Sequence, residues 1–403
     1  MKNFIVISFL ILVATIWYLL SIDYFGIYND KSINTIQQEN NIIQKEQESK
    51  YLLLQQAENN ISAISVSSLI KGLDKINKLP FNGIIIYGES FTDKIMKNQD
   101  VKYQDILDEL KPLRDSNTSN IEIFLLVDID FPGDFWDNNI WSRITKNFSN
   151  LAKATKDLGF KGIVIDTTPK SQNAYKMINF KFPSIDDIEK NSTIFDNWEI
   201  RGAKYYKSQH FGYRNRGYSF LEHIKRVTQL FRKIMVAITT NYPDITLLVY
   251  SGVDLNQNRE LPNVYKKALF LGLQRGADDK STLYDMAFVN PKFTKEIHFQ
   301  NSYFWRKYGV VEDRYNDDLN SSWQWKIPKS DRKEWIDRVK VGFIIDTNQI
   351  KNISQITSSI VKALKYSDGY VILFSNRENW IDPKNKRRVK ILKKRIEKIL
   401  KEN

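Results

Sequence analysis

The sequence of 403 residues contains no cysteine and only three histidines. The absence of cysteine excludes disulfides and thiolate chemistry, and it leaves the redox compartment unspecified. His210, His223 and His298 lack the spacing of metal ligands, and we expect no metal centre. No glycine-rich phosphate loop follows the first predicted strands, which argues against a nucleotide. We therefore expect the protein to work without a cofactor.

The N-terminus carries an apolar run over residues 4–20, interrupted only by Ser8 and Thr15 and preceded by Lys2. Such a run is about long enough to span a bilayer. Because it ends in aromatics without a clear small-residue cleavage site, we predict an uncleaved signal-anchor, residues 1–24, with the remaining protein on the extracytoplasmic side. A cleaved, secreted form is the alternative. Residues 25–60, rich in Gln, Asn, Glu and Lys, are expected to form a polar stalk.

From residue 61 onward, short apolar runs alternate with amphipathic segments of helical spacing. The apolar runs predict strands at 61–66, 79–87, 121–130, 162–166, 245–250, 283–289, 341–346 and 369–375. Eight strands separated by helices indicate a closed (β/α)8 barrel of the TIM type, spanning residues 61–403. A doubly wound open sheet is the alternative fold.

Two further segments are distinctive. Residues 167–217 form the longest break in the strand–helix repeat, and such insertions usually build lids or binding walls. The net charge is +13, and residues 384–401 hold ten Lys or Arg against one Glu. Val389, Leu392, Ile396 and Ile399 fall at helical spacing, so we predict a terminal amphipathic helix with a solvated basic face. We do not expect nucleic acid as the partner, although an anionic lipid or glycan surface stays open.

Two of the predicted strands echo each other, KGIVIDT at 161–167 and VGFIIDT at 341–347. Each ends at an aspartate, Asp166 in the fourth strand and Asp346 in the seventh. The C-terminal ends of barrel strands are where such folds carry their chemistry, and two carboxylates are the usual equipment of a glycoside hydrolase. The pair is therefore our candidate acid and nucleophile or base. The alternative is that each aspartate merely caps the segment that follows it.

Other side chains are predicted at the same rim. Asp285, within the sixth strand, is a further catalytic candidate. Aromatic rings stack on the C–H faces of sugars, whereas carboxylates and amides bind sugar hydroxyls. The alternative is that the aromatic residues serve ordinary packing. The candidate substrate-binding residues are Asp128, Asp130, Trp136, Tyr250, Asn376 and Trp380.

Three segments resemble a broad group of glycoside-hydrolase-like α/β-barrel proteins of bacterial envelopes. They are LPFNG at 79–83, LGFKGIVIDTTP at 158–169 and YVILFSN at 370–376, within a similarity over residues 62–383. The resemblance implies a barrel fold, and Asp166 matches the aspartate that these proteins have after the fourth strand. Such proteins typically read Asp-x-Glu after the fourth strand and glutamate after the eighth, where this chain has Thr168 and Asn376. Asp166 would then need another partner, such as Asp346 or Asp285.

These observations predict a membrane-anchored glycoside hydrolase that acts on a cell-envelope or secreted polysaccharide. The alternative is a catalytically inactive barrel that binds glycan or serves a structural role in the envelope. Either protein would contact a polysaccharide or oligosaccharide through the rim and the membrane through its N-terminal helix.

Overall fold

The computed structural model describes residues 49–58, 63–97, 99–116, 121–129, 135–168, 220–250, 261–289, 295–309, 327–350, 352–376, 380 and 385–402. Lys50–Asn403 form one compact unit. The predicted signal-anchor (1–24), most of the polar stalk and nearly all of the insertion at 167–217 lie outside the described residues. No helix in the described ranges is long and apolar enough to cross a membrane.

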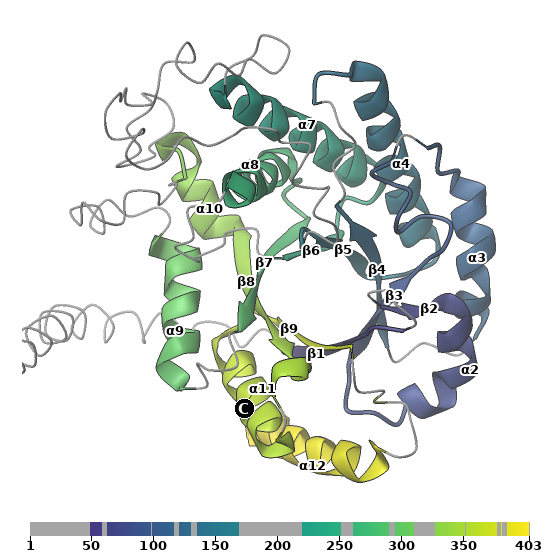
Figure 1. The fold of residues 1–403 in the computed structure, drawn as a ribbon, viewed down its shortest axis with the longest axis vertical. Helices are drawn as coiled ribbons and strands as arrows, with labels where there is room; N and C mark the ends of the chain where they lie inside the picture. Colours follow the sequence, from purple (N-terminus) through teal and green to yellow (C-terminus); the bar gives the residue numbers. More distant parts are fainter. Residues whose placement is uncertain are drawn as a thin grey trace, which may run out of the picture. The chain divides into compact units, whose positions relative to one another are not determined.

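The strands form one parallel sheet that closes on itself (Figure 1). They are β1 Tyr51–Gln56, β2 Ile64–Ser65, β3 Gly83–Tyr87, β4 Glu122–Asp128, β5 Gly162–Asp166, β6 Thr246–Tyr250, β7 Thr282–Val289, β8 Val339–Asp346 and β9 Tyr370–Ser375. Neighbours in this order pair in parallel from β3 to β9, and β1 pairs with both β9 and β3. The short β2 adds to the end of β3. The predicted (β/α)8 barrel is thereby confirmed.

Helices surround the barrel (Figure 1). They are α2 Val66–Ile76, α3 Tyr103–Asp115, α4 Asn138–Asp157, α7 Phe220–Asn241, α8 Leu261–Gly276, α9 Glu296–Phe304, α10 Arg332–Arg338, α11 Ile353–Tyr366 and α12 Lys386–Glu402. A π-helical turn, Trp305–Gly309, follows α9, and 3-10 turns occupy Lys329–Asp331 and Thr347–Gln349. The predicted basic terminal helix corresponds to α12.

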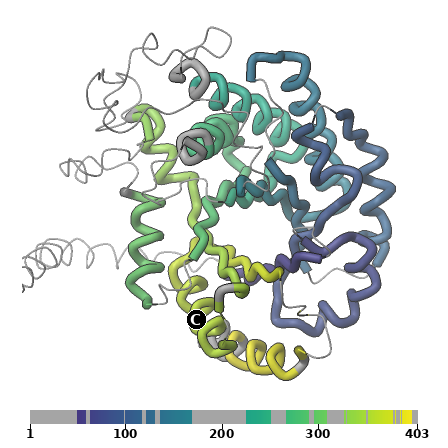
Figure 2. The backbone as a smooth tube through the Cα atoms, in the orientation of Figure 1, coloured from purple at the N-terminus to yellow at the C-terminus, as the bar shows by residue number. Residues whose placement is uncertain are grey.

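The first strand corrects the sequence-based boundary. Tyr51–Gln56 forms the first barrel strand, although the predicted polar stalk included it. The predicted first strand, 61–66, contributes only the short β2, because α2 already begins at Val66 and Ser65 caps it. The chain therefore enters the barrel earlier than predicted. Figure 2 shows this entry strand beside the late strand β9, which joins the two ends of the described chain.

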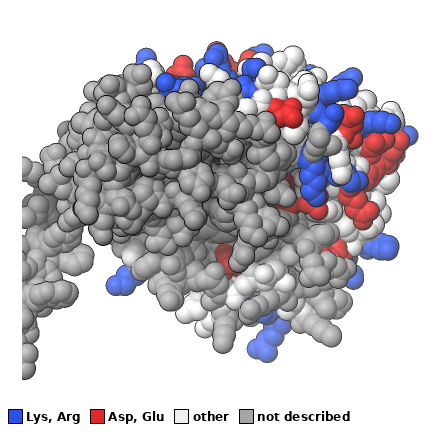
Figure 3. Space-filling model, turned by 45° about the horizontal axis from the view of Figure 1, so that its top comes forward, with Lys and Arg blue, Asp and Glu red and all other residues white. Residues whose placement is uncertain are grey.

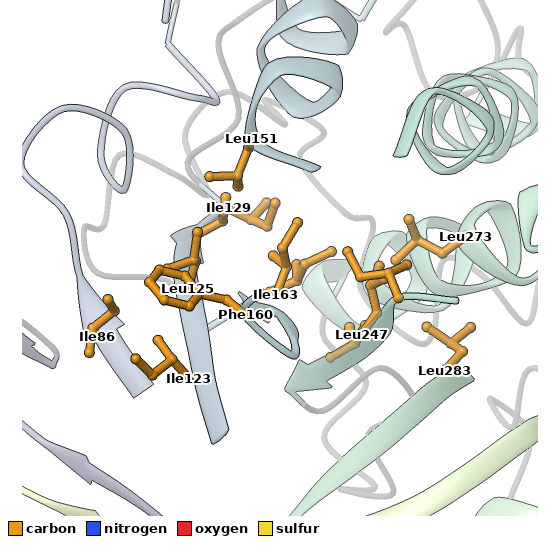
Figure 4. Packing of buried hydrophobic residues seen from close by; sticks show 14 of the residues in the cluster. Ile86, Ile123, Leu125, Ile129, Leu151, Phe160, Ile163, Leu247, Leu273 and Leu283 are labelled. Atoms are coloured by element: carbon orange, nitrogen blue, oxygen red, sulfur yellow. The ribbon is translucent and has the colours of Figure 1, made fainter. Parts of the chain in front are cut away.

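Alternate residues of each strand face opposite sides, and this divides the core into two layers. The inner layer fills the barrel with side chains such as Phe124, Leu126 and Val164. The outer layer lies between strands and helices; Figure 4 shows Leu125 and Ile163 of the strands near Leu151 of α4. The direction of any strand side chain follows from this alternation, which decides which polar residues can reach the barrel mouth.

Candidate active site

The C-terminal mouth of the barrel carries an inner layer of polar side chains. Phe124 and Leu126 face inward on β4, so Asp128 does too, and Val164 sets the same direction for Asp166 on β5. Ile344 likewise predicts an inward direction for Asp346 on β8. Three strands thus end in an inward carboxylate at the face where barrel enzymes place their chemistry.

Asp128 and Asp166 are direct neighbours. They are paired residues of β4 and β5, and the Ile129 N–H donates to the Asp166 carbonyl at 2.9 Å. Each aspartate is 6% exposed. Neighbouring strands lie about 4.8 Å apart, so two carboxylates on the same face of paired positions come close together. Both residues were predicted from the sequence, but Asp128 was expected to bind substrate and Asp166 was expected to act together with Asp346.

Each of the two echoed aspartates also caps the turn after its strand. Asp166 Oδ1 accepts a hydrogen bond from the Thr168 N–H at 2.8 Å. Asp346 Oδ1 accepts from the Asn348 N–H at 2.9 Å and begins the turn Thr347–Gln349. Both aspartates therefore cap the turn that follows the strand. A cap that uses one carboxylate oxygen also fixes the orientation of the group, which a reacting carboxylate needs.

Tyr250 ends β6, the strand next to β5, and its side chain reaches across the barrel to Gln55. Its side chain is buried, and its hydroxyl donates to Oε1 of Gln55 on the first strand. Burial raises the pKa of the Tyr250 phenol well above its usual value, and the charges of Asp166 and Asp128 raise it further. Tyr250 therefore stays a neutral hydrogen-bonding group close to both carboxylates. Gln55 was missed by sequence reasoning because β1 was read as part of the stalk.

Tyr87 ends β3 beside Asp128. Its hydroxyl donates to Oδ2 of Asp93 at 2.7 Å. Burial, followed by this hydrogen bond and the charges of Asp93, Asp128 and Glu89, raises the pKa of Tyr87. Asp93 gave no signal in the sequence, because it lies in a turn beyond the strand rather than at its end. The two tyrosines flank the Asp128–Asp166 pair on both sides.

Asp285 is not at the mouth, and its assignment as a catalytic candidate is wrong. Tyr284 and Met286 face into the barrel, so Asp285 between them faces outward. Its side chain is 0% exposed and forms an ion pair with Arg306 of the π-helical turn at 2.6 Å. The expectation that a carboxylate at a strand end faces the barrel mouth does not apply here, because Asp285 lies within β7. The alternation of side chains along the strand decides its direction.

The other predicted substrate-binding residues lie in different places in the structure. Trp380 is buried in the outer core, where its ring lies 5.7 Å from the Arg388 guanidinium of α12, so it does not line the mouth. Trp136 is half-buried near the start of α4, with Arg226 of α7 above its ring at 5.5 Å. Asn376 is exposed after β9, and its N–H donates to Asn348 Oδ1 at 3.0 Å, which connects it to the Asp346 turn. Asp130 lies outside the described residues.

The described residues contain no group of three or more His, Asp or Glu side chains arranged to hold a metal ion. The expectation of a protein without cofactors stays a prediction.

The opposite, N-terminal mouth is closed by packing. The Tyr370 hydroxyl donates to Glu122 Oε2 at 2.9 Å, and the Tyr370 ring stacks on Tyr51 with centroids 5.1 Å apart. Tyr284 packs edge-on against Tyr370 at the same centroid separation of 5.1 Å. Such a filled end is typical of the stabilising face of a barrel.

Glu122 makes this closed end sensitive to pH. Burial raises the pKa of Glu122, although the Tyr370 hydrogen bond and Lys161 oppose that shift. Stability from a raised pKa is present below the unfolded value and is lost as pH rises through the folded value. Glu122→Gln should therefore gain stability relative to the wild type as pH increases from about 4 to 7. Urea unfolding at both pH values measures this; a gain that is equal at both values would contradict the prediction.

No family model matches the chain, and no curated protein sequence matches it. Among solved structures, a β-mannanase from the blue mussel Mytilus edulis is similar, with a TM-score of 0.44 and 10% identity over 85% of this chain and 91% of that one. A β-1,4-mannanase from the sea hare Aplysia kurodai gives a TM-score of 0.43 and 10% identity over 86% and 92%.

A 3-keto-D-glucoside 4-epimerase from E. coli gives a TM-score of 0.38 and 11% identity over 87% of this chain and 99% of that one. The closed parallel barrel of this chain is established by its own strand pairing. No activity follows from likenesses at this level.

Proposed function

We propose that the protein is a membrane-anchored glycoside hydrolase that cleaves a polysaccharide at the C-terminal mouth of its barrel. The observation that carries this proposal is the inward-facing pair Asp128 and Asp166, side by side at the ends of neighbouring strands and flanked by Tyr87 and Tyr250. Residues 1–24 would anchor the chain, with the barrel on the extracytoplasmic side.

The spacing of neighbouring strands favours a retaining reaction. Carboxyl groups about 5–5.5 Å apart act as acid and nucleophile, whereas inverting enzymes need about 6.5–9.5 Å to admit a water. Register neighbours on strands about 4.8 Å apart fit the shorter separation. We assign Asp166 as the nucleophile, because the Thr168 N–H fixes its orientation, and Asp128 as the acid.

The reaction then runs in two steps. Asp128 gives its proton to the glycosidic oxygen while the Asp166 carboxylate attacks the anomeric carbon, so the C–O bond to the leaving sugar breaks as the ester to Asp166 forms. Asp128, now ionised, takes a proton from water, whose oxygen attacks the anomeric carbon and releases Asp166. Asp346, farther round the rim, would bind sugar hydroxyls.

A comparison of two triple variants tests this function. The full chain in detergent is assayed for new reducing ends on a panel of polysaccharides. The mouth variant Asp128→Asn/Asp166→Asn/Asp346→Asn should show no hydrolysis. The control variant carries the same changes at exposed aspartates that precede strands at the opposite mouth, Asp115, Asp244 and Asp279, and should keep full activity.

Equal activity in the two triple variants would overturn the assignment. If no polysaccharide is cleaved by the wild type, but glycan is bound and that binding is lost in the mouth variant, the protein is a glycan-binding barrel instead.

A further inference from the structure

One aromatic ring is exposed at the C-terminal mouth. Phe288, near the end of β7, is 41% exposed. Among the residues whose burial is described, every other phenylalanine, tyrosine and tryptophan is buried or partly buried. On the outer surface, Figure 3 shows basic and acidic side chains interspersed wherever described residues are visible. Phe288 instead offers an uncharged ring, which lacks the polar group that tyrosine or tryptophan can turn toward water.

The Phe288 ring lies on the inner side of the barrel. Ala287 and Val289 pack on the outer core, so the residue between them in β7 faces inward. Strand pairing agrees, because Phe288 is the register partner of Ile344 on β8, which belongs to the inner layer. Met286 belongs to the inner layer too. Phe288 is thus the next inward side chain of β7 beyond Met286, toward the C-terminal mouth.

Tyr250 supports this ring. Phe288 packs edge-on against Tyr250, with ring centroids 5.8 Å apart and an angle of 86° between the planes. The Tyr250 hydroxyl donates to Oε1 of Gln55, and the Tyr250 backbone carbonyl accepts from the Thr167 hydroxyl. Tyr250 is therefore held at both ends. A ring on such a rigid support loses little conformational entropy when a ligand binds to it.

The position of Phe288 along the sheet brings it near the proposed catalytic pair. The strands β5, β6 and β7 are consecutive neighbours, and they carry Asp166, Tyr250 and Phe288. Phe288 is thus two strand spacings, roughly 10 Å, from Asp166 along the sheet. On the other side, Asp346 of β8 lies two residues beyond the register partner of Phe288. The exposed ring therefore lies between two of the carboxylates that end inward-facing strands.

The chemistry of the exposed ring limits what it can bind. A phenyl ring offers a flat apolar face and makes no conventional hydrogen bond. A pyranose matches this face, because its axial C–H groups form a flat apolar surface while its hydroxyls project from the edge. A carboxylate such as that of Asp346, on the next strand, can accept hydrogen bonds from edge hydroxyls. The ring itself cannot distinguish hydroxyls, so it selects for a sugar face without an axial substituent.

We propose that Phe288 is a specificity-determining residue on which one pyranose of the polysaccharide stacks by its C–H face, beside the Asp128–Asp166 pair. This inference rests on the proposed function and adds the class of substrate, a polymer of pyranoses with an unobstructed C–H face. Phe288 holds the sugar and takes no part in bond breaking, so its loss changes binding rather than the chemical step. Sequence reasoning missed Phe288, because an apolar residue inside a strand gives no sign of exposure.

Binding to the full chain that carries Asp166→Asn tests this proposal without consuming the probe. The probes are cellohexaose, mannohexaose and chitohexaose, titrated by calorimetry in detergent. Phe288→Leu keeps an apolar side chain but removes the flat face, and it should raise the Kd of the best-bound probe about 2- to 10-fold, the range for a lost aromatic contact. Phe288→Tyr keeps the ring and should retain the original Kd. Equal melting temperatures show that the variants are folded.

Ile297→Ala is the matched control, because Ile297 is 47% exposed but lies on the outer helix α9, and its Kd should not change. With Asp166 intact, Phe288→Leu should raise KM and leave kcat nearly unchanged. An unchanged Kd in Phe288→Leu, an equal loss in Phe288→Tyr, or no binding of any probe would overturn the proposal. Binding that depends on Phe288 in a chain that hydrolyses nothing would keep the stacking site and refute only the hydrolase.

Discussion

Arg306→Met is expected to lower the free energy of unfolding by about 3–5 kcal/mol, because it removes the guanidinium that forms an ion pair with the buried carboxylate of Asp285. Both side chains are inside the protein, Asp285 at 0% exposure and Arg306 at 5%. The Arg306 carbonyl also accepts a hydrogen bond from Trp335 Nε1 at 3.0 Å, so the π-helical turn is fixed on the outer face of the barrel. Urea unfolding measures the loss.

Two further variants distinguish the effect of losing one partner of the buried ion pair from the effect of removing a charge elsewhere in the protein. Asp285→Leu combined with Arg306→Met removes both charges and should cost much less than the sum of the single changes. Lys365→Met breaks the exposed pair with Glu296 and should cost about 0–1 kcal/mol. A loss below about 1 kcal/mol for Arg306→Met would show that the pair does not clamp β7 to this turn.

Asp166→Asn is expected to lower kcat by at least about 100- to 10,000-fold, the range that one positioned general acid or base supplies. Asparagine keeps the shape of the side chain and an oxygen that can accept the Thr168 N–H, so the melting temperature should not change. The variant therefore separates chemistry from folding. The measurement is steady-state hydrolysis of whichever polysaccharide the wild type cleaves.

The partner of Asp166 follows from two companion variants. If the neighbouring pair is catalytic, Asp128→Asn should lose as much kcat as Asp166→Asn, whereas Asp346→Asn should chiefly raise KM. The anomeric configuration should then be retained. The opposite ranking, with inversion, would instead support the pair Asp166 and Asp346, and unchanged kcat in Asp166→Asn would refute its catalytic role.

Most of the barrel was predictable because its strands are buried on both sides. A run such as GIVID at 162–166 needs apolar residues on both faces, and this continuous pattern differs from that of a surface helix. The strand β1 was missed for a related reason, because its buried end is polar and so lacks the continuous apolar pattern. Gln55 and Gln56 end that strand, and both are buried because Gln55 bonds Tyr250 and Gln56 accepts from the Trp380 N–H at 2.8 Å. Those partners lie far away in the sequence.

The site was predicted only in part. Asp166 and Asp346 were found because they end recognisable strands. Asp285 was misassigned and Trp380 was placed at the mouth, because a residue's distance from a strand end does not say which side of the sheet it faces. Asp93, bonded to Tyr87, was missed because turns carry no periodic pattern.

The sequence by itself determined the barrel, its strands from β3 onward and the aspartates Asp166 and Asp346, since burial and periodicity are local properties of the chain. Only the tertiary structure decided which carboxylates meet. It placed Asp128 beside Asp166 through the register of β4 and β5, and it turned Asp285 outward into an ion pair. Register and ion pairing join residues that are distant along the chain, so no local pattern contains them.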